Sequence, residues 1–176
     1  MLLLSTVIGE YAHEKARDGV WVPKTAYENT NIFELLTAIT GDVPVSKIDV
    51  GVARHVKQTL MKLRRNMSKD KRYAHKPLND VLALNPTDTL SIDTINKHLS
   101  RISGLFAWAE RNGHIKQNPF IGLQLKKTKR PHEERQAFDA DDLTTLFGTV
   151  IFHEKQFKHA YYYWLLLLAL YTGARY

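Results

Sequence analysis

The chain has 176 residues, of which 44% are apolar and 24% carry a charge. This mixture can bury a core, so it excludes a disordered acidic tail and a collagen-like repeat, and the length fits one large domain or two small ones. The absence of cysteine excludes a disulfide scaffold, a thiolate zinc site and a cysteine nucleophile. The net charge of +7 favours a polyanionic partner without identifying it.

The basic residues gather in two segments. Residues 54–76 carry a net charge of +8 and residues 124–136 a net charge of +3, whereas residues 1–53 carry −3. Two basic clusters separated by a neutral segment are able to contact one phosphate backbone at two places. A solvated helix face and a polar loop explain the same charges, so charge alone leaves both interpretations open.

Three helices are predicted in the first third of the chain. The first ends at Asp18-Gly19, the second begins at Pro23 and ends at Gly41-Asp42, and Asp49 is expected to cap the third. Their apolar stripes are Leu4, Val7, Ile8 and Tyr11, then Ile32, Leu35, Leu36 and Ile39, then Val52, Val56, Leu60 and Leu63. Residues 66–90 lack periodicity, so we expect a long connection with little regular structure.

The strongest helical pattern begins after Ser91, a good N-cap, and ends at Asn112-Gly113. Its apolar stripe consists of Ile92, Ile95, Leu99, Ile102, Phe106 and Ala109, and its opposite face carries Asn96, Lys97, Ser100, Arg101 and Gly104. A face of small, polar and basic residues fits a DNA major groove without steric conflict. It equally fits an ordinary solvent-exposed surface.

A domain boundary is predicted within residues 114–136, which contain prolines and no apolar periodicity. Beyond it, carboxylates at Asp139, Asp141 and Asp142 are expected to cap another helix. The apolar run 161–171 is too short for a bilayer, which needs about 20 residues, and indicates a buried helix. The second domain looks cut off, so we expect aggregation or pairing of two copies through this helix.

No self-contained active site is evident. The eight histidines lack metal-ligand spacing, and neither a glycine-rich phosphate loop nor a G-x-S-x-G elbow is present. The first residues do not resemble a signal peptide. We therefore expect no metal, no cofactor, no small-molecule substrate and no membrane partner.

Three short motifs occur one after another along the chain, and their order is informative. They are W-A-x-x-x-G-x-I-x-x-N-P (Trp108–Pro119), F-x-x-x-D-L (Phe138–Leu143) and Y-T-G-x-R (Tyr171–Arg175). Together they resemble the tyrosine recombinases, the phage-type integrases, over essentially the whole chain. Each motif alone is a weak signal, whereas the three in this order are specific.

The resemblance implies a mainly α fold. It consists of a helical core-binding domain of four to five helices over 1–123, a basic interdomain linker over 124–136, and the first helices of an incomplete α+β catalytic domain over 137–176. It also implies DNA integration or recombination through a tyrosine–DNA intermediate, without a cofactor. The expected partners are double-stranded DNA and other protomers on DNA, in the bacterial cytoplasm, from a prophage or mobile element.

The resemblance also assigns site residues. Arg175 matches the first catalytic arginine, whose guanidinium fork binds the scissile phosphate. The helix after Ser91 matches one that lies on DNA, and the linker matches one that follows the duplex; the implied contacts are Asn96, Lys97, Ser100, Arg101, Lys126, Lys127, Lys129 and Arg130. The other catalytic groups and the nucleophile are missing, and Tyr176 cannot replace it, so we expect an inactive fragment. The acidic charge of residues 1–53 argues against contacts from Lys24 or Tyr27.

Two other classes of function remain open. One is a non-catalytic helical DNA-binding regulator or excision accessory protein. The other is a protein-interaction module whose basic patch binds an acidic partner and which is indifferent to DNA at physiological salt.

Overall fold

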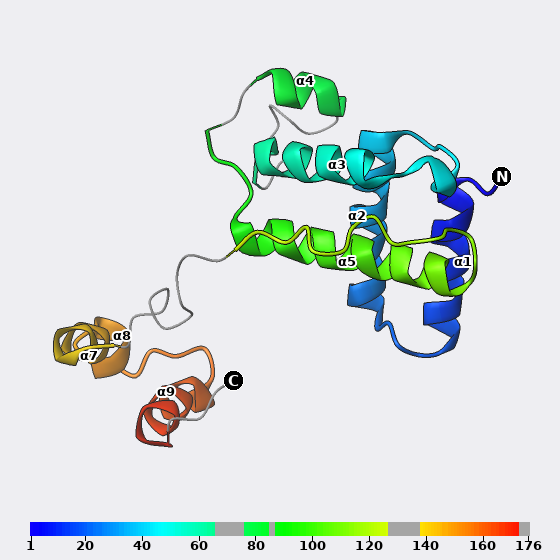
Figure 1. Cartoon of the computed structure of the whole chain (residues 1–176). Coiled ribbons are helices and arrows are strands. Elements are labelled where there is room, and N and C mark those ends of the chain that lie inside the picture. Colours follow the sequence, from blue (N-terminus) through cyan, green and yellow to red (C-terminus); the bar gives the residue numbers. More distant parts are fainter. Residues whose placement is uncertain (66–75, 85–86, 127–137, 173–176) are drawn as a thin grey trace. The chain divides into compact units, whose positions relative to one another are not determined.

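The computed structural model describes residues 1–65, 76–84, 87–126 and 138–172 (Figure 1). The chain divides into two compact units, Met1–Lys127 and Thr128–Tyr176. The described residues are mainly helical, as predicted, and their β-type pairing is limited to two isolated bridges. In the first unit the helices are α1 (Leu4–Arg17), α2 (Pro23–Thr40), η1 (Val45–Lys47), α3 (Val50–Lys62), α4 (Leu78–Ala83) and α5 (Ile92–Arg111).

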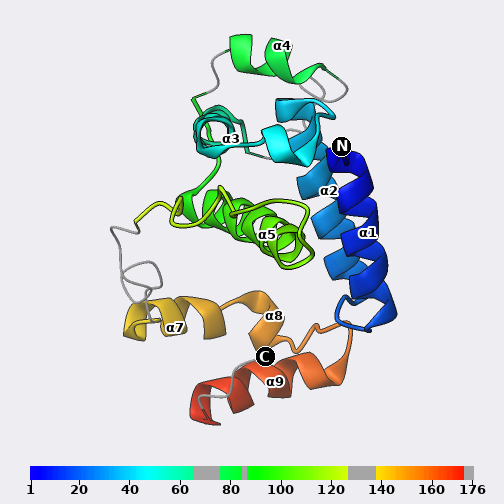
Figure 2. The same ribbon diagram turned by 45° about the vertical axis from the view of Figure 1, so that its right-hand side comes forward.

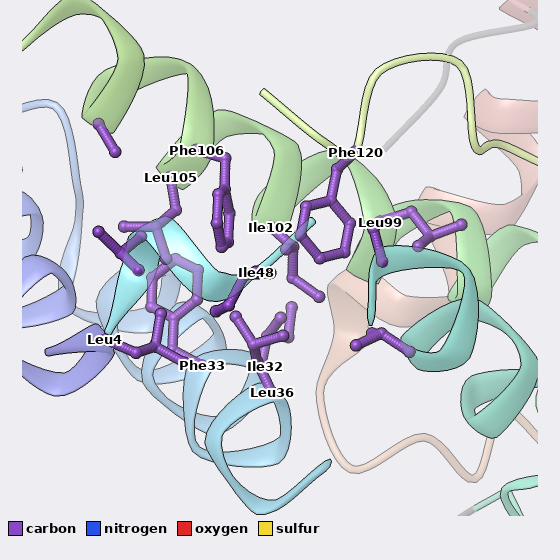
Figure 3. Packing of buried hydrophobic residues seen from close by; sticks show 14 of the residues in the cluster. Leu4, Ile32, Phe33, Leu36, Ile48, Leu99, Ile102, Leu105, Phe106 and Phe120 are labelled. Atoms are coloured by element: carbon purple, nitrogen blue, oxygen red, sulfur yellow. The ribbon is translucent and has the colours of Figure 1, made fainter. Parts of the chain in front are cut away.

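Helix α2 lies at the centre of the first unit. It contacts α1, α3 and α5, and α5 also contacts α1 and α3 (Figure 2). The space between them is filled by aromatic and aliphatic side chains, among them Phe33, Leu36 and Phe106, all of which are buried (Figure 3). Each such side chain stabilises the fold by about 1.5–3 kcal/mol relative to exposure. One shared core therefore fixes the faces that the helices turn outward.

The predicted helix ends are confirmed. Gly19, with φ 66°, follows the C-cap of α1, Pro23 is the first residue of α2, and the Asp49 carboxylate accepts from the Val52 N–H at the start of α3. The apolar stripes are also largely confirmed, but the buried set is larger, because Ala53, Leu105 and Trp108 are buried as well. Phe33 is buried although it was not assigned to a stripe, and Ile92, the first residue of α5, is 38% exposed, so the buried stripe begins at Ile95.

The start of α1 is held by the turn that follows α2. Gly41 ends α2 with φ 74°, a left-handed conformation that glycine adopts without strain. The next residue, Asp42, accepts hydrogen bonds from the Ser5 N–H at 2.9 Å and the Ser5 hydroxyl at 2.7 Å. These bonds hold the pKa of the Asp42 carboxyl below its ordinary value. A carboxylate 37 residues away in sequence thus caps the first helix.

The expectation of little regular structure over 66–90 was wrong for α4. Its six residues follow Pro77, and Val81 is fully buried while Leu78 and Leu82 pack against the core. A helix this short has too few turns to show periodicity, so it depends on tertiary packing and leaves no recognisable pattern in the sequence. The remaining parts of that connection at 66–75 and 85–86 lie outside the described residues.

After α5 the chain turns back and packs along the same helix. Asn118, only 4% exposed, donates to the Ser103 carbonyl at 3.0 Å and accepts from the Phe120 N–H at 2.9 Å. The rings of Phe106 and Phe120 lie 4.8 Å apart. Residues 114–126 therefore belong to the first unit, although no periodicity marks them. Of the expected linker 124–136, the structure describes only 124–126, and the division between the two units follows Lys127.

The second unit contains α7 (Ala140–Phe147), α8 (Val150–His153) and α9 (Ala160–Thr172). The predicted cap of α7 is confirmed: Asp139 accepts from the Asp142 N–H, and Asp142 accepts from the Asp139 N–H. Aromatic rings gather around Phe152, with Phe147 at 4.8 Å and Phe157 at 5.1 Å. No strand occurs between 138 and 172, so the α+β character of this part stays a prediction.

Helix α9 forms where the apolar run predicts a helix, but the expected burial is wrong for the residues described. Trp164 is 60% exposed and Leu168 55% exposed, because the second unit covers only part of a helix that is apolar on all sides. The helices in the described part of the chain are each too short or too polar to cross a membrane.

Candidate nucleic-acid interface

Helix α5 presents a basic face because its other face is committed to the core. The Ser91 hydroxyl caps it by accepting from the Thr94 N–H at 3.2 Å, as predicted. Seven of its side chains are buried: Ile95, Leu99, Ile102, Leu105, Phe106, Trp108 and Ala109. Residues between these positions must point away from the core, given the helical period of 3.6. They include Lys97, Ser100 and Arg101.

A second helix adds a cation to this face. The ammonium group of Lys97 donates to the Glu28 carboxylate of α2 at 2.7 Å, and this bond lowers the pKa of Glu28. Lys24, one turn before Glu28, and Arg101 of α5 lower the same pKa through their charges. Cations from two helices therefore act on one carboxylate. We refer to Lys24, Lys97 and Arg101 as the α2–α5 basic cluster.

The charge of Arg101 acts on groups of two other helices, α1 and α2. Besides acting on Glu28 of α2, its charge opposes the effect of burial, which raises the pKa of Tyr11 in α1. Arg101 is partly buried, and within the described residues its guanidinium makes neither a hydrogen bond nor an ion pair.

The four predicted contact residues of α5 have different surroundings. Ser100 is exposed, Lys97 is ion-paired and Arg101 is partly buried. The Asn96 amide is instead occupied: its Nδ2 donates to the Leu125 carbonyl at 2.9 Å, and its Oδ1 accepts from the Leu125 N–H at 2.7 Å.

Asn96 brings the basic segment after α5 to this helix. Leu125 is held against Asn96, and the next residue, Lys126, is exposed. Lys126 therefore directly follows Leu125, whose backbone is bonded to Asn96, the residue before Lys97. The other predicted linker contacts, Lys127, Lys129 and Arg130, lie outside the described residues, as does Arg175.

Lys24 is the residue that sequence reasoning discounted. The net negative charge of residues 1–53 hid it, because the sum takes no account of which helix face each carboxylate occupies. Several of those carboxylates gather elsewhere, around a cavity of about 720 Å³ lined by Glu10, Glu14 and Asp18 together with Trp108. Sequence offers no sign of this separation, since it depends on how α1 and α2 pack against α5.

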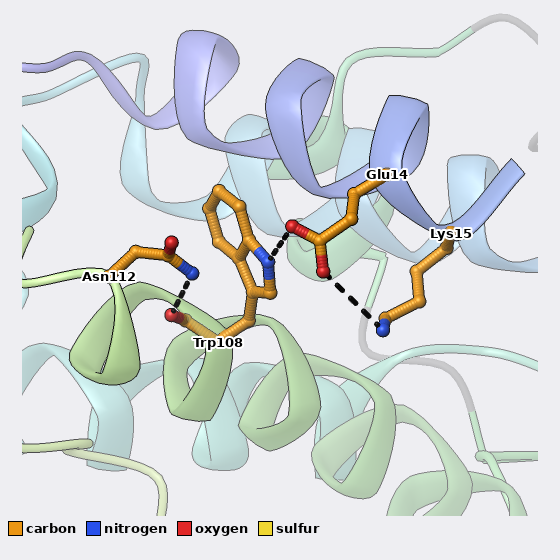
Figure 4. Close-up of polar contacts among 4 residues, drawn as sticks. All are labelled: Glu14, Lys15, Trp108 and Asn112. Carbon is orange, nitrogen blue, oxygen red and sulfur yellow. Dashed lines mark hydrogen bonds and ion pairs between the residues drawn. The ribbon is translucent and has the colours of Figure 1, made fainter. Parts of the chain in front are cut away.

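The acidic side of α1 has a structural role. The indole Nε1–H of Trp108 donates to the Glu14 carboxylate at 2.7 Å, joining α5 to α1 (Figure 4). Asn112 donates to the Trp108 carbonyl at 3.0 Å, and Lys15 lies 3.7 Å from the other oxygen of Glu14. Trp108 and Asn118, which both belong to the first motif, thus hold the end of α5 and the segment that follows it.

A second basic surface lies on α3. This helix carries Arg54, Lys57 and Lys62 and contains no acidic residue. It forms most of the described part of the basic segment 54–76, of which residues 66–75 lie outside the description.

The described histidines and carboxylates do not form a metal site. The Nδ1 of His98 is buried without a hydrogen-bond partner in the described part of the chain, and burial together with Lys97 lowers the pKa of His98. The first unit also holds a cavity of about 540 Å³ between the start of α3 and residues 113–119. The residues of the α2–α5 basic cluster line neither this cavity nor the acidic one.

Comparison with known proteins gives one partial similarity. Over 66 residues the chain is 30% identical to a tyrosine recombinase, XerC, of Oceanobacillus iheyensis. The matched segment amounts to 34% of this chain and 22% of that protein. No model of a known protein family matches the chain, and no solved structure matches it. The similarity supports a relation to tyrosine recombinases, in agreement with the motifs, at the level of a partial match.

Proposed function

We propose that this chain is the DNA-binding portion of a site-specific tyrosine recombinase of the integrase type. Its first unit binds one face of a DNA duplex through Lys97, Ser100 and Arg101 of α5 and Lys24 of α2. Lys126, Lys127, Lys129 and Arg130 continue the contact along the phosphate backbone. The partial similarity to XerC supports the class, and the α2–α5 basic cluster supports the surface.

The observation that carries the proposal is the convergence of cations from two helices. The Lys97 ammonium of α5 pairs with Glu28 of α2 across a helix–helix packing, and the charges of Lys24 and Arg101 act on the same carboxylate. A local excess of positive charge of this kind attracts phosphates and releases their counterions.

Cleavage and rejoining of DNA belong to the proposed whole protein. There a tyrosine attacks the phosphodiester, forms a 3′-phosphotyrosyl link and releases a 5′-hydroxyl, which later reverses the step on another strand. We assign Arg175 to the scissile phosphate, where a guanidinium donates two hydrogen bonds to the phosphoryl oxygens and stabilises the developing charge. The nucleophile is not among the residues of this chain, and other protomers on DNA are its proposed partners.

Binding to a duplex of about 30 base pairs, measured by fluorescence anisotropy across a salt series, tests the proposal. Each phosphate contact contributes roughly 0.9 to the slope of log K against log salt. Lys97→Ala with Arg101→Ala is therefore expected to reduce that slope by about 0.9 to 1.8, the lower value applying where Glu28 already neutralises Lys97.

The matched control removes the same charge elsewhere. Arg17 and Lys47 are exposed cations of α1 and η1, outside the basic cluster. Arg17→Ala with Lys47→Ala is expected to leave the slope nearly unchanged. An equal decrease of the slope in both double variants means that net charge alone drives binding. If the wild-type chain does not bind DNA, an acidic protein partner is favoured instead.

A further inference from the structure

The α2–α5 basic cluster contains its own anion. Glu28 is 2.7 Å from the Lys97 ammonium, and its side chain is 33% exposed while that of Lys97 is 49% exposed. The pair therefore lies at the surface, on the face that is proposed to meet DNA. Its carboxylate is also within electrostatic reach of Lys24 and Arg101.

A phosphate that binds Lys97 must compete with this carboxylate. Carboxylate and phosphate oxygens are both strong acceptors for an ammonium donor. A phosphate placed beside the intact pair also meets the like charge of Glu28, whereas one that replaces Glu28 must first break the pair. Either way, part of the attraction of the three cations is lost.

We propose that Glu28 is a built-in counter-anion that weakens the binding of this surface to DNA of arbitrary sequence. The inference rests on the proposed DNA-binding function and adds a residue that limits non-specific affinity. Removal of its charge frees Lys97 and leaves the cluster with three uncompensated cations. If Glu28 only orients Lys97 for DNA, the effect on affinity is the opposite: removal of Glu28 weakens DNA binding.

Glu28→Gln and Glu34→Gln provide a matched comparison on one helix. Glu34 is an exposed residue of α2 for which no ion pair occurs within the described residues, so both variants gain one unit of net charge. With a 30-base-pair duplex of arbitrary sequence, Glu28→Gln is expected to bind about 3- to 10-fold more tightly than wild type at 0.1 M salt. Its slope of log K against log salt is expected to steepen by about 0.9. Glu34→Gln is expected to show less than half of either change.

Lys97→Ala completes a double-mutant cycle. In that background Glu28→Gln is expected to lose the slope increase, because the freed ammonium is absent. Equal thermal midpoints for the variants exclude a folding effect. An unchanged or weakened affinity of folded Glu28→Gln overturns the inference, even if wild-type binding depends on Lys97 and Arg101. Absence of duplex binding by every variant overturns the proposed function as well.

Discussion

The side-chain amide of Asn96 and the backbone of Leu125 exchange two hydrogen bonds, of 2.9 and 2.7 Å. A residue that the resemblance assigns to DNA therefore has both ends of its amide committed to the protein. The bonds hold the start of the basic segment against α5, 29 residues away in sequence. Asn96 thus acts on the proposed interface by fixing the backbone that precedes Lys126 against α5.

Asn96→Ala is expected to destabilise the first unit by about 1–2 kcal/mol, since two hydrogen bonds are lost at a net value near 1 kcal/mol each. Urea unfolding followed by circular dichroism measures the change. Ser100→Ala, at an exposed position on the same face, is the control and is expected to stay within about 0.5 kcal/mol of wild type. Equal stability of the two variants contradicts the structural role of Asn96.

Trp108→Phe is expected to cost about 1–3 kcal/mol, because a side chain only 6% exposed loses both volume and its hydrogen bond to Glu14. Glu14→Gln keeps an acceptor oxygen, so its loss is expected to be smaller. Chemical denaturation of both variants measures which of them loses more unfolding free energy. A larger loss for Glu14→Gln than for Trp108→Phe shows that the charge, rather than packing, dominates this contact.

The stability of the first unit is expected to depend on pH through Asp42. Because Ser5 lowers the pKa of Asp42 in the folded chain, this carboxyl stabilises the fold above its unfolded pKa of about 3.9. The stabilisation is lost as the pH falls through the lower, folded pKa. The difference in unfolding free energy between wild type and Asp42→Asn is therefore expected to be constant above about pH 5 and to shrink below about pH 4. Urea titrations at four pH values measure it, and a difference that grows toward low pH contradicts the cap.

Helix α9 is expected to cause self-association. Trp164, Leu168 and Tyr171 are exposed on a helix without a charged residue, and an apolar surface of this kind favours contact between copies. Light scattering is expected to report masses above that of the monomer, and Leu168→Glu is expected to lower them. A monodisperse wild-type monomer contradicts this expectation.

The sequence was sufficient where local chemistry decides the structure. Asp49, Ser91 and Asp139 cap helices where they were expected to, because an N-cap depends on side chains within three or four residues. Apolar periodicity likewise identified most of the buried residues of the long helices.

The sequence was insufficient where distant contacts decide. Helix α4 and the segment after α5 are held by tertiary packing, the latter through Asn118 and Leu125, neither of which produces a periodic pattern. Lys24 and Glu28 belong to the candidate site only because α2 packs against α5, so charge sums along the chain could not find them.

Lysine footprinting on DNA tests the central claim most directly. The intact chain is treated with an amine-acetylating reagent, with and without a 30-base-pair duplex at low salt, and each lysine is quantified by mass spectrometry. The account predicts that the duplex slows acetylation of Lys24, Lys97 and Lys126, while the exposed Lys47 of η1 reacts at the same rate. Unchanged rates at Lys24 and Lys97, together with protection of Lys57 and Lys62 on α3, contradict it and place the DNA on the other basic surface.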